Sequence, residues 1–248
     1  MTRIIGDGVI PEVRAFYDVR DWLQIDCVLA AHLCKITGDH LDGEVVYNME
    51  PLYDGCRSFS IGYLETLKRC TVLDYCARNV AYLATLGIEA FHLPYGYHES
   101  LTRHVQVEKD IDFLMVGSIN ERRVNVLAGL QQYGVFVWVQ GAYGADLDRL
   151  IARAKVVVNC HYCDSHPLEV VRLNYLMAND CNIVSELGND PTVNAKYESG
   201  ILFTDDVVAA CRYALDNPKN SKETVMNIQT NQTEALAWVN VRSKLCLG

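Results

Sequence analysis

Short apolar runs alternate with longer amphipathic stretches through the second half of the chain, and this alternation constrains the fold more than any other feature. The runs are DFLMVG (112–117), VFVWVQG (135–141), KVVVN (155–159), NIVSE (182–186) and GILF (200–203). Such runs are typical of strands that are buried on both faces, and a sheet built of them is parallel and covered by helices on both sides. The pattern therefore predicts an α/β fold.

The stretches between these runs have helical spacing. Leu147, Leu150, Ile151 and Ala154, for example, fall on one face of a helix over 146–154. The other predicted helices span 121–134, 167–179 and 207–217. Together with the strands they predict a Rossmann-like domain over residues 107–220.

The first half alternates in the same way, although less regularly. Its predicted strands are 26–31, 44–49, 71–76 and 90–94, and its predicted helices are 60–69 and 77–87. We therefore expect a reduced N-terminal α/β domain over 1–106, joined to the second domain by the polar segment 98–110. Residues 221–248 form a predicted helical tail that could pack back on the N-terminal domain.

Composition excludes some classes of protein. The net charge of −9 disfavours a non-specific nucleic-acid-binding protein, which needs a broad basic surface. No apolar run reaches the roughly 18 residues of a membrane span, and the first residues lack the features of a signal peptide, so we expect a cytoplasmic protein. Most of the ten cysteines lie in apolar segments, which indicates reduced core residues rather than disulfides.

Parallel sheets bind ligands at the carboxyl ends of their strands, which here are followed by polar loops. In GSINERR (117–123), Gly117 and Ser118 end a strand and open a helix, where backbone N–H groups favour an anion. Arg122 and Arg123 add planar donors that suit phosphate oxygens, the alternative being an exposed arginine pair. The loop matches neither the Walker A nor the GxGxxG pattern, so nicotinamide and flavin cofactors are not expected.

Glu169 begins the helix that follows the loop NCHYCDSHPLE (159–169). Its carboxylate could accept hydrogen bonds from the two vicinal hydroxyls of a ribose. The alternatives are interaction with the helix dipole or an i,i+3 pair with Arg172.

The same loop brings together four residues that can bind metals: Cys160, His161, Cys163 and His166. A structural zinc site usually combines two ligand pairs, and the sequence offers no second CxxC pair. A thioredoxin-like redox pair would open a helix within a recognisable motif, which is also missing. We therefore expect no metal here, but a strand-to-helix turn in which His161 lines a ligand site and Ser165 caps the next helix.

The segments DIDFLMVGSINERR, ARAKVVVNCHY, LEVVRLNYLMAND and IVSE together resemble the nucleotide-sugar-binding half of GT-B glycosyltransferases. More narrowly, they are similar to compact glycosyltransferase-like proteins of bacterial, phage and large-virus type. The resemblance covers about 107–215 and extends to EVVYNMEPL, VLDYCARNVAYLATLGI and LPYGY in the first half. It implies two facing Rossmann-like domains, GT-B-like, with the N-terminal one reduced.

The resemblance also implies a hexosyltransferase-type enzyme that transfers a sugar from a nucleotide-sugar donor to an unknown acceptor. A UDP-sugar is the first candidate for the donor. No metal and no other cofactor are expected. Gly117, Ser118, Arg122 and Arg123 would face the pyrophosphate, and Glu169 would face the ribose. Gly141 and Tyr143 would flank the nucleotide base. The remaining candidates for the donor site are Asn120, His161 and Arg172. A homo-oligomer in which another subunit completes the acceptor surface is one alternative.

One feature departs from the family. Many retaining members carry a Glu-x7-Glu pair, whose positions fall here on His166 and Asn174. The stereochemical outcome and the ribose contact therefore stay open.

A catalytic base would come from strand ends of the first domain. His32, Glu50 and Asp74 are the candidates, and the alternative for each is a structural role.

Two other functions remain open with the same fold. One is a phage-type DNA glycosyltransferase acting on a hydroxymethylated base, for which Arg57, Lys68, Arg69, Arg103 and Arg122 could form a basic rim. The other is a non-catalytic module that binds nucleotide-sugars.

Overall fold

A computed structural model describes residues 3–5, 28–30, 41–49, 51–52, 61–97, 99–103, 105–142, 144–162, 167–228 and 232–245. The chain forms two compact units. Unit 1 comprises Met1–Arg14, Asp18–Tyr95 and Gln229–Gly248, and unit 2 comprises Ala15–Tyr17 and Gly96–Ile228. Each unit is described by itself.

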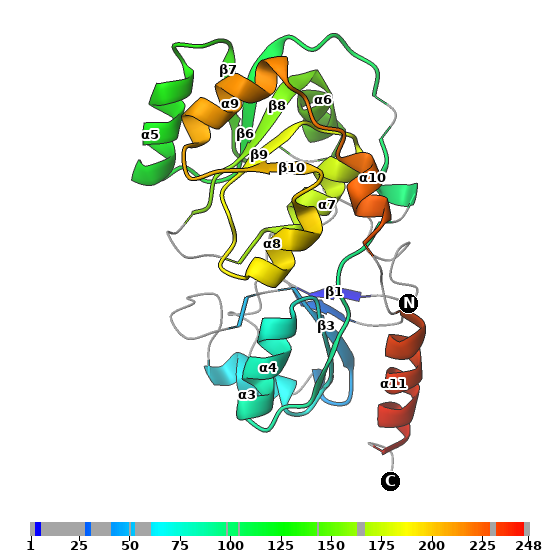
Figure 1. Ribbon diagram of the computed structural model, residues 1–248. Helices are drawn as coiled ribbons and strands as arrows, with labels where there is room; N and C mark the ends of the chain where they lie inside the picture. The colour runs from blue at the N-terminus through cyan, green and yellow to red at the C-terminus, as the bar shows by residue number, and fades with distance from the viewer. Residues whose placement is uncertain are drawn as a thin grey trace. The chain divides into compact units, whose positions relative to one another are not determined.

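The sheet of unit 2 is parallel, with the strand order β7-β6-β8-β9-β10 among the described residues (Figure 1). The first strand of the unit therefore lies inside the sheet, with its successor on one side and the later strands on the other. The strands are β6 (Ile111–Val116), β7 (Phe136–Val139), β8 (Ala154–Asn159), β9 (Ile183–Ser185) and β10 (Ile201–Phe203).

Helices cover both faces of this sheet. Because the connections β6–β7 and β7–β8 run in opposite directions across it, right-handed crossovers place their helices on opposite faces. The first of these helices, α5, packs beside α9 (Figure 1), and Gly129 permits the approach because a Cβ there would lie 2.7 Å from Val208 Cγ2. The helices are α5 (Glu121–Leu130), α6 (Gly144–Arg153), α7 (Val170–Ala178), α8 (Pro191–Tyr197), α9 (Val207–Asp216) and α10 (Lys222–Met226), with the 3-10 helix η3 (Glu99–Leu101) before β6.

The inner strands of unit 2, β6, β8 and β9, are mostly buried on both faces, as their composition predicts, whereas the edge strands β7 and β10 are more exposed. Side chains on the α5 and α9 side form one core cluster, which includes Phe113, Met115, Val156 and Val158. The neighbouring strand residues Leu114, Val157 and Ile183, which alternate with them, are buried as well. This double burial is the reason that the runs carry so few polar residues.

Unit 1 is a second parallel sheet, whose described strands follow chain order, β1-β2-β3-β4-β5. Helix α11 packs against β4 and β5, where the rings of Phe91 and Trp238 lie 5.7 Å apart. The strands are β1 (Arg3–Ile5), β2 (Val28–Ala30), β3 (Val45–Asn48), β4 (Thr71–Asp74) and β5 (Ala90–His92), and the helices are α3 (Ile61–Leu67), α4 (Ala77–Thr85) and α11 (Gln232–Leu245).

The predicted α/β fold class is confirmed, since both units contain a parallel sheet with helices between its strands. Every strand predicted from an apolar run is present, with its ends shifted by a few residues. Strand β1 and the short helices α8 and α10 were not predicted, because segments this short carry little periodic signal. Within the described residues, no helix is both long and apolar enough to cross a membrane.

Candidate functional site

The strand order of unit 2 creates a switch point between β6 and β8. The chain leaves β6 toward one edge of the sheet and leaves β8 toward the other, so the loops after these two strands diverge. In open α/β sheets, ligands bind at such a point, beside the carboxyl ends of the strands. The loops here begin at Gly117 and Cys160, which places the predicted anion-binding loop and the predicted strand-to-helix turn side by side.

Asn120 fixes the loop after β6. Its side-chain oxygen accepts a hydrogen bond from the backbone N–H of Arg123 at 3.0 Å and so caps helix α5. Its amide nitrogen donates to the carbonyl of Tyr162 at 2.6 Å. One side chain therefore ends the first loop and holds the second.

Arg123 joins the ends of β6 and β8 from inside the protein. It is 4% exposed, and its Nε and Nη2 donate to the carbonyl of Cys160 at 3.0 and 2.6 Å. Nη1 donates to the carbonyl of Ser118 at 2.6 Å, and the ring of Tyr162 lies 5.5 Å from the guanidinium. Burial, followed by the nearby charge of Arg172, lowers the pKa of Arg123.

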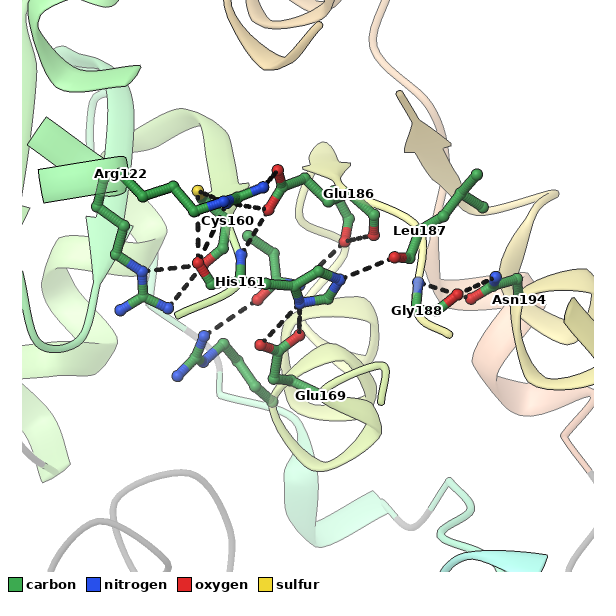
Figure 2. Close-up of polar contacts among 12 residues, drawn as sticks. Arg122, Cys160, His161, Glu169, Glu186, Leu187, Gly188 and Asn194 are labelled. Carbon is green, nitrogen blue, oxygen red and sulfur yellow. Dashed lines mark hydrogen bonds and ion pairs between the residues drawn. The ribbon is translucent and has the colours of Figure 1, made fainter. Parts of the chain in front are cut away.

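Arg122 is paired with Glu186, the residue that follows β9 (Figure 2). Its Nη1 donates to Glu186 Oε2 at 2.7 Å, and its Nη2 donates to Oε1. The same carboxylate accepts the backbone N–H of His161 at 2.6 Å. Burial raises the pKa of Glu186, but the hydrogen bonds from Arg122 and His161 outweigh it, so the pKa is lowered and the pair is ionic.

The ring of His161 lies between a carboxylate and a carbonyl (Figure 2). Nε2 is 3.0 Å from the carbonyl oxygen of Leu187, and Nδ1 is 3.0 and 2.9 Å from the two carboxylate oxygens of Glu169. A carbonyl only accepts, so Nε2 carries a proton. Nδ1 also faces an acceptor, which assigns an imidazolium–carboxylate pair. Burial lowers the pKa of His161, but the hydrogen bond and charge of Glu169 outweigh it and raise the pKa.

Asn159, the last residue of β8, connects this pair to an arginine of helix α7. Its fully buried amide donates to Glu169 and to Ser185 Oγ, both at 2.9 Å. Its oxygen accepts from Arg172 Nη1 at 3.0 Å. Because both ends of the amide are engaged, Asn159 fixes Glu169 and Arg172 relative to the end of the strand.

Gly117 lies close to two guanidinium groups. Its φ of +128° favours glycine, and a Cβ there would lie 3.2 Å from Arg123 Nη1 and 3.7 Å from Arg172 Nη2. Trp138 of β7 donates to its carbonyl at 2.7 Å. The backbone at the end of β6 is therefore held in one conformation, with two positive charges where a side chain would otherwise lie.

The structure brings together most of the residues predicted for the donor site. Gly141 lies apart from this network, exposed just after the neighbouring strand β7, with a φ of +78°. Tyr143, Cys163, Ser165 and His166 lie outside the described residues. The assembled residues are Gly117, Ser118, Asn120, Arg122, Arg123, His161, Glu169 and Arg172.

Sequence reasoning missed Asn159 and Glu186 as members of this network. Asn159 ends the run VVVN and Glu186 ends the run IVSE, so their position at a strand end offered a signal. Glu169 also differs in detail from its expected placement. It precedes the first turn of α7, and its carboxylate is engaged by His161 and Asn159.

Asp74 is the described member of the three predicted catalytic bases, since His32 and Glu50 lie outside the described residues. It ends β4 of unit 1 and is fully buried. Its carboxyl accepts from Asn48 Nδ2 at 2.6 Å, from the Cys76 N–H at 2.8 Å and from Asn79 Nδ2 at 3.0 Å. Burial raises the pKa of Asp74 to about 8. This environment suits a structural carboxyl, because a catalytic base must be accessible to the hydroxyl of the sugar acceptor.

Asn174 occupies the position that corresponds to the second Glu of the Glu-x7-Glu pair. It is fully buried and accepts a hydrogen bond from Tyr197 Oη at 2.8 Å. In the part of the chain that the structure describes, no three His, Cys, Asp or Glu side chains come together in a way that could hold a metal ion.

Comparisons by sequence find similar proteins in one virus. No family model matches the sequence. The uncharacterized protein L140 of Acanthamoeba polyphaga mimivirus is 29% identical over 171 residues, which cover 64% of this chain and 56% of that protein. A second mimivirus protein, the uncharacterized L137, is 25% identical over 174 residues, or 66% of this chain and 24% of that protein. The match therefore spans about half the length of the first relative and less of the second.

Two similar solved structures each cover more than nine tenths of this chain. AviGT4, a glycosyltransferase involved in avilamycin A biosynthesis, has a TM-score of 0.51 at 13% identity, covering 93% of this chain and 78% of that one. WaaG, a glycosyltransferase involved in lipopolysaccharide biosynthesis, has a TM-score of 0.50 at 12% identity, covering 92% and 76%. At such identities the similarity concerns the fold. The chain therefore has a GT-B-like glycosyltransferase fold with two Rossmann-like parallel sheets.

Proposed function

We propose that this chain is a glycosyltransferase that moves a hexose from a nucleotide-sugar donor, a UDP-sugar, to the hydroxyl of an acceptor, without a metal ion. The observation that carries the proposal is the positive charge of three arginines, Arg122, Arg123 and Arg172, at the switch point of unit 2. This charge favours a diphosphate, a guanidinium group with free donors matches phosphate oxygens in shape, and the N-terminus of α5 adds its dipole at the same place.

The proposed chemistry needs stabilisation of the leaving nucleoside diphosphate. As the bond between the sugar and the phosphate oxygen breaks, negative charge grows on the diphosphate, and fixed cations lower the barrier by binding that charge. Arginines with this role would replace a divalent cation. An acceptor hydroxyl then attacks the anomeric carbon and loses its proton to a base.

A thermal-shift screen against UDP, GDP, ADP, CMP and the corresponding nucleotide-sugars tests the proposal. We expect at least one nucleoside diphosphate to raise the melting temperature, because a ligand present at 100 times its Kd stabilises the folded state by about 2.7 kcal/mol. The donor that binds is then incubated without acceptor, and slow release of free sugar is expected from an active transferase. If no nucleotide or nucleotide-sugar changes the melting temperature, the proposal fails.

A non-catalytic nucleotide-sugar-binding module is the second candidate, and the buried Asn174 in place of the family's glutamate is the observation that favours it. Donor binding without any hydrolysis or transfer would support this candidate over the enzyme. The DNA glycosyltransferase alternative predicts that duplex DNA binds with strong salt dependence.

A further inference from the structure

The three arginines at the switch point differ in how far the protein already uses them. Both terminal nitrogens of Arg122 donate to Glu186, and Nη1 is also within hydrogen-bonding distance of Cys160 Sγ and the His161 carbonyl. Every nitrogen of Arg123 donates to a backbone carbonyl, at Ser118 or Cys160. These two side chains hold the loops in place, and a ligand would have to compete with the protein for them.

Arg172 is engaged much less. Among the described residues, its one hydrogen bond is from Nη1 to Asn159 at 3.0 Å. Its Nε is buried and has no hydrogen-bond partner there. A buried donor without an acceptor costs roughly 1–3 kcal/mol, and more when the group is charged, so such a donor calls for an explanation.

The surroundings of Arg172 favour an anion as the missing acceptor. A Cβ at Gly117 would lie 3.7 Å from Arg172 Nη2 and 3.2 Å from Arg123 Nη1, so glycine leaves a small space here that both guanidinium groups border. Arg123 is close enough that the charge of Arg172 lowers its pKa, which means that two cations face this space. An anion placed there would relieve the repulsion between them.

We infer that Arg172 is the side chain that binds a phosphate of the donor, whereas Arg122 and Arg123 chiefly hold the loops that form the site. This inference rests on the proposed function and makes it specific. It also reassigns the main phosphate contact from the loop after β6 to helix α7. Asn159 positions Arg172 for this contact, because its amide is held at the other end by Glu169 and Ser185.

Isothermal titration calorimetry on the full chain tests the inference. The proteins are wild type, Arg172→Gln and Arg172→Lys, with Arg149→Gln as the control because Arg149 lies on α6 with its side chain 64% exposed. The probes are inorganic pyrophosphate, UDP, GDP and ADP, and the nucleoside of whichever nucleotide binds. We expect Arg172→Gln to bind that nucleoside diphosphate about tenfold to a hundredfold more weakly, as for the loss of a charge-assisted hydrogen bond. The nucleoside and the control should change by less than about twofold.

Arg172→Lys keeps the charge, so it remains informative if the glutamine variant does not fold. It should bind the nucleoside diphosphate several-fold more weakly than wild type, since an ammonium lacks the planar fork. If a folded Arg172 variant binds the nucleotide as tightly as wild type, the inference is wrong and the proposed function stands. If wild type binds none of the probes, the proposed function fails, and the inference fails with it.

Discussion

Asp74 offers the sharpest test of the physical reasoning, because its carboxyl is fully buried and accepts hydrogen bonds from neutral donors of Asn48, Cys76 and Asn79. Burial disfavours the charged form, and it raises the pKa of Asp74 from 3.8 to about 8. The folded state therefore binds a proton more tightly than the unfolded chain. The contribution of Asp74 to the free energy of unfolding is fully present below pH 3.8 and is lost as the pH rises from there to about 8. Above that pH it does not change further.

The magnitude follows from the two pKa values. Their difference, 8 minus 3.8, is about 4 units, and each unit corresponds to about 1.4 kcal/mol. Ionisation at pH 9 thus costs the folded state on the order of 5 kcal/mol. Asp74→Asn removes this titration, but its amide would meet the donor of Asn48, which must then turn over and change its bond with Tyr63. We expect the variant to be less stable than wild type by about 1 kcal/mol at pH 5 and more stable by several at pH 9.

Urea denaturation at pH 5, 7 and 9 measures the difference in stability between wild type and Asp74→Asn. Unfolding is monitored by hydrogen–deuterium exchange of peptides from β3 and β4, so that unit 1 is observed alone. Asp146→Asn is the control, since that side chain is 80% exposed. The unfolding midpoint of wild type should fall from pH 5 to pH 9, while that of the Asp74 variant should change less. Parallel profiles for the two proteins would refute the reasoning, because they would mean that Asp74 does not titrate in this range.

Two further predictions concern the network in unit 2. His161→Gln should lower stability by about 1–3 kcal/mol at pH 6, because glutamine cannot replace both N–H donors, to Glu169 and Leu187. Because the pKa of His161 is raised in the folded state, its contribution to stability is fully present below pH 6.5 and is lost as the pH rises through the pKa of the folded state. The stability difference between wild type and His161→Gln should therefore shrink at alkaline pH. Thermal melts that show the same difference at every pH would contradict this. A double-mutant cycle with Arg122→Gln and Glu186→Gln should give a coupling energy of about 1–3 kcal/mol, below that of a fully buried pair because the side chains are 32% and 13% exposed. The exposed pair Arg149–Asp146 is the matched control and should give a coupling near zero by the same urea melts.

The sequence by itself determined the fold class and the edge where the site lies. Strands buried on both faces carry few polar residues, so runs such as DFLMVG and KVVVN indicate a parallel sheet from composition alone. The carboxyl ends of those strands then follow from the direction of the chain, and Gly117, Arg122 and Arg123 could be selected because they come directly after one of them.

Only the tertiary structure decided how these side chains are used. Arg122 meets Glu186 across 64 positions of sequence, and Asp74 meets Asn48 across 26, and no local pattern specifies such partners. A hydrogen bond depends on the distance and direction of one particular neighbour, which are set by the pairing of β6, β8 and β9 in one sheet and of β3 with β4 in the other rather than by residue type. For this reason the sequence could list three arginines, while the fold distinguished the two that hold the protein together from Arg172, whose buried Nε has no partner in the described structure.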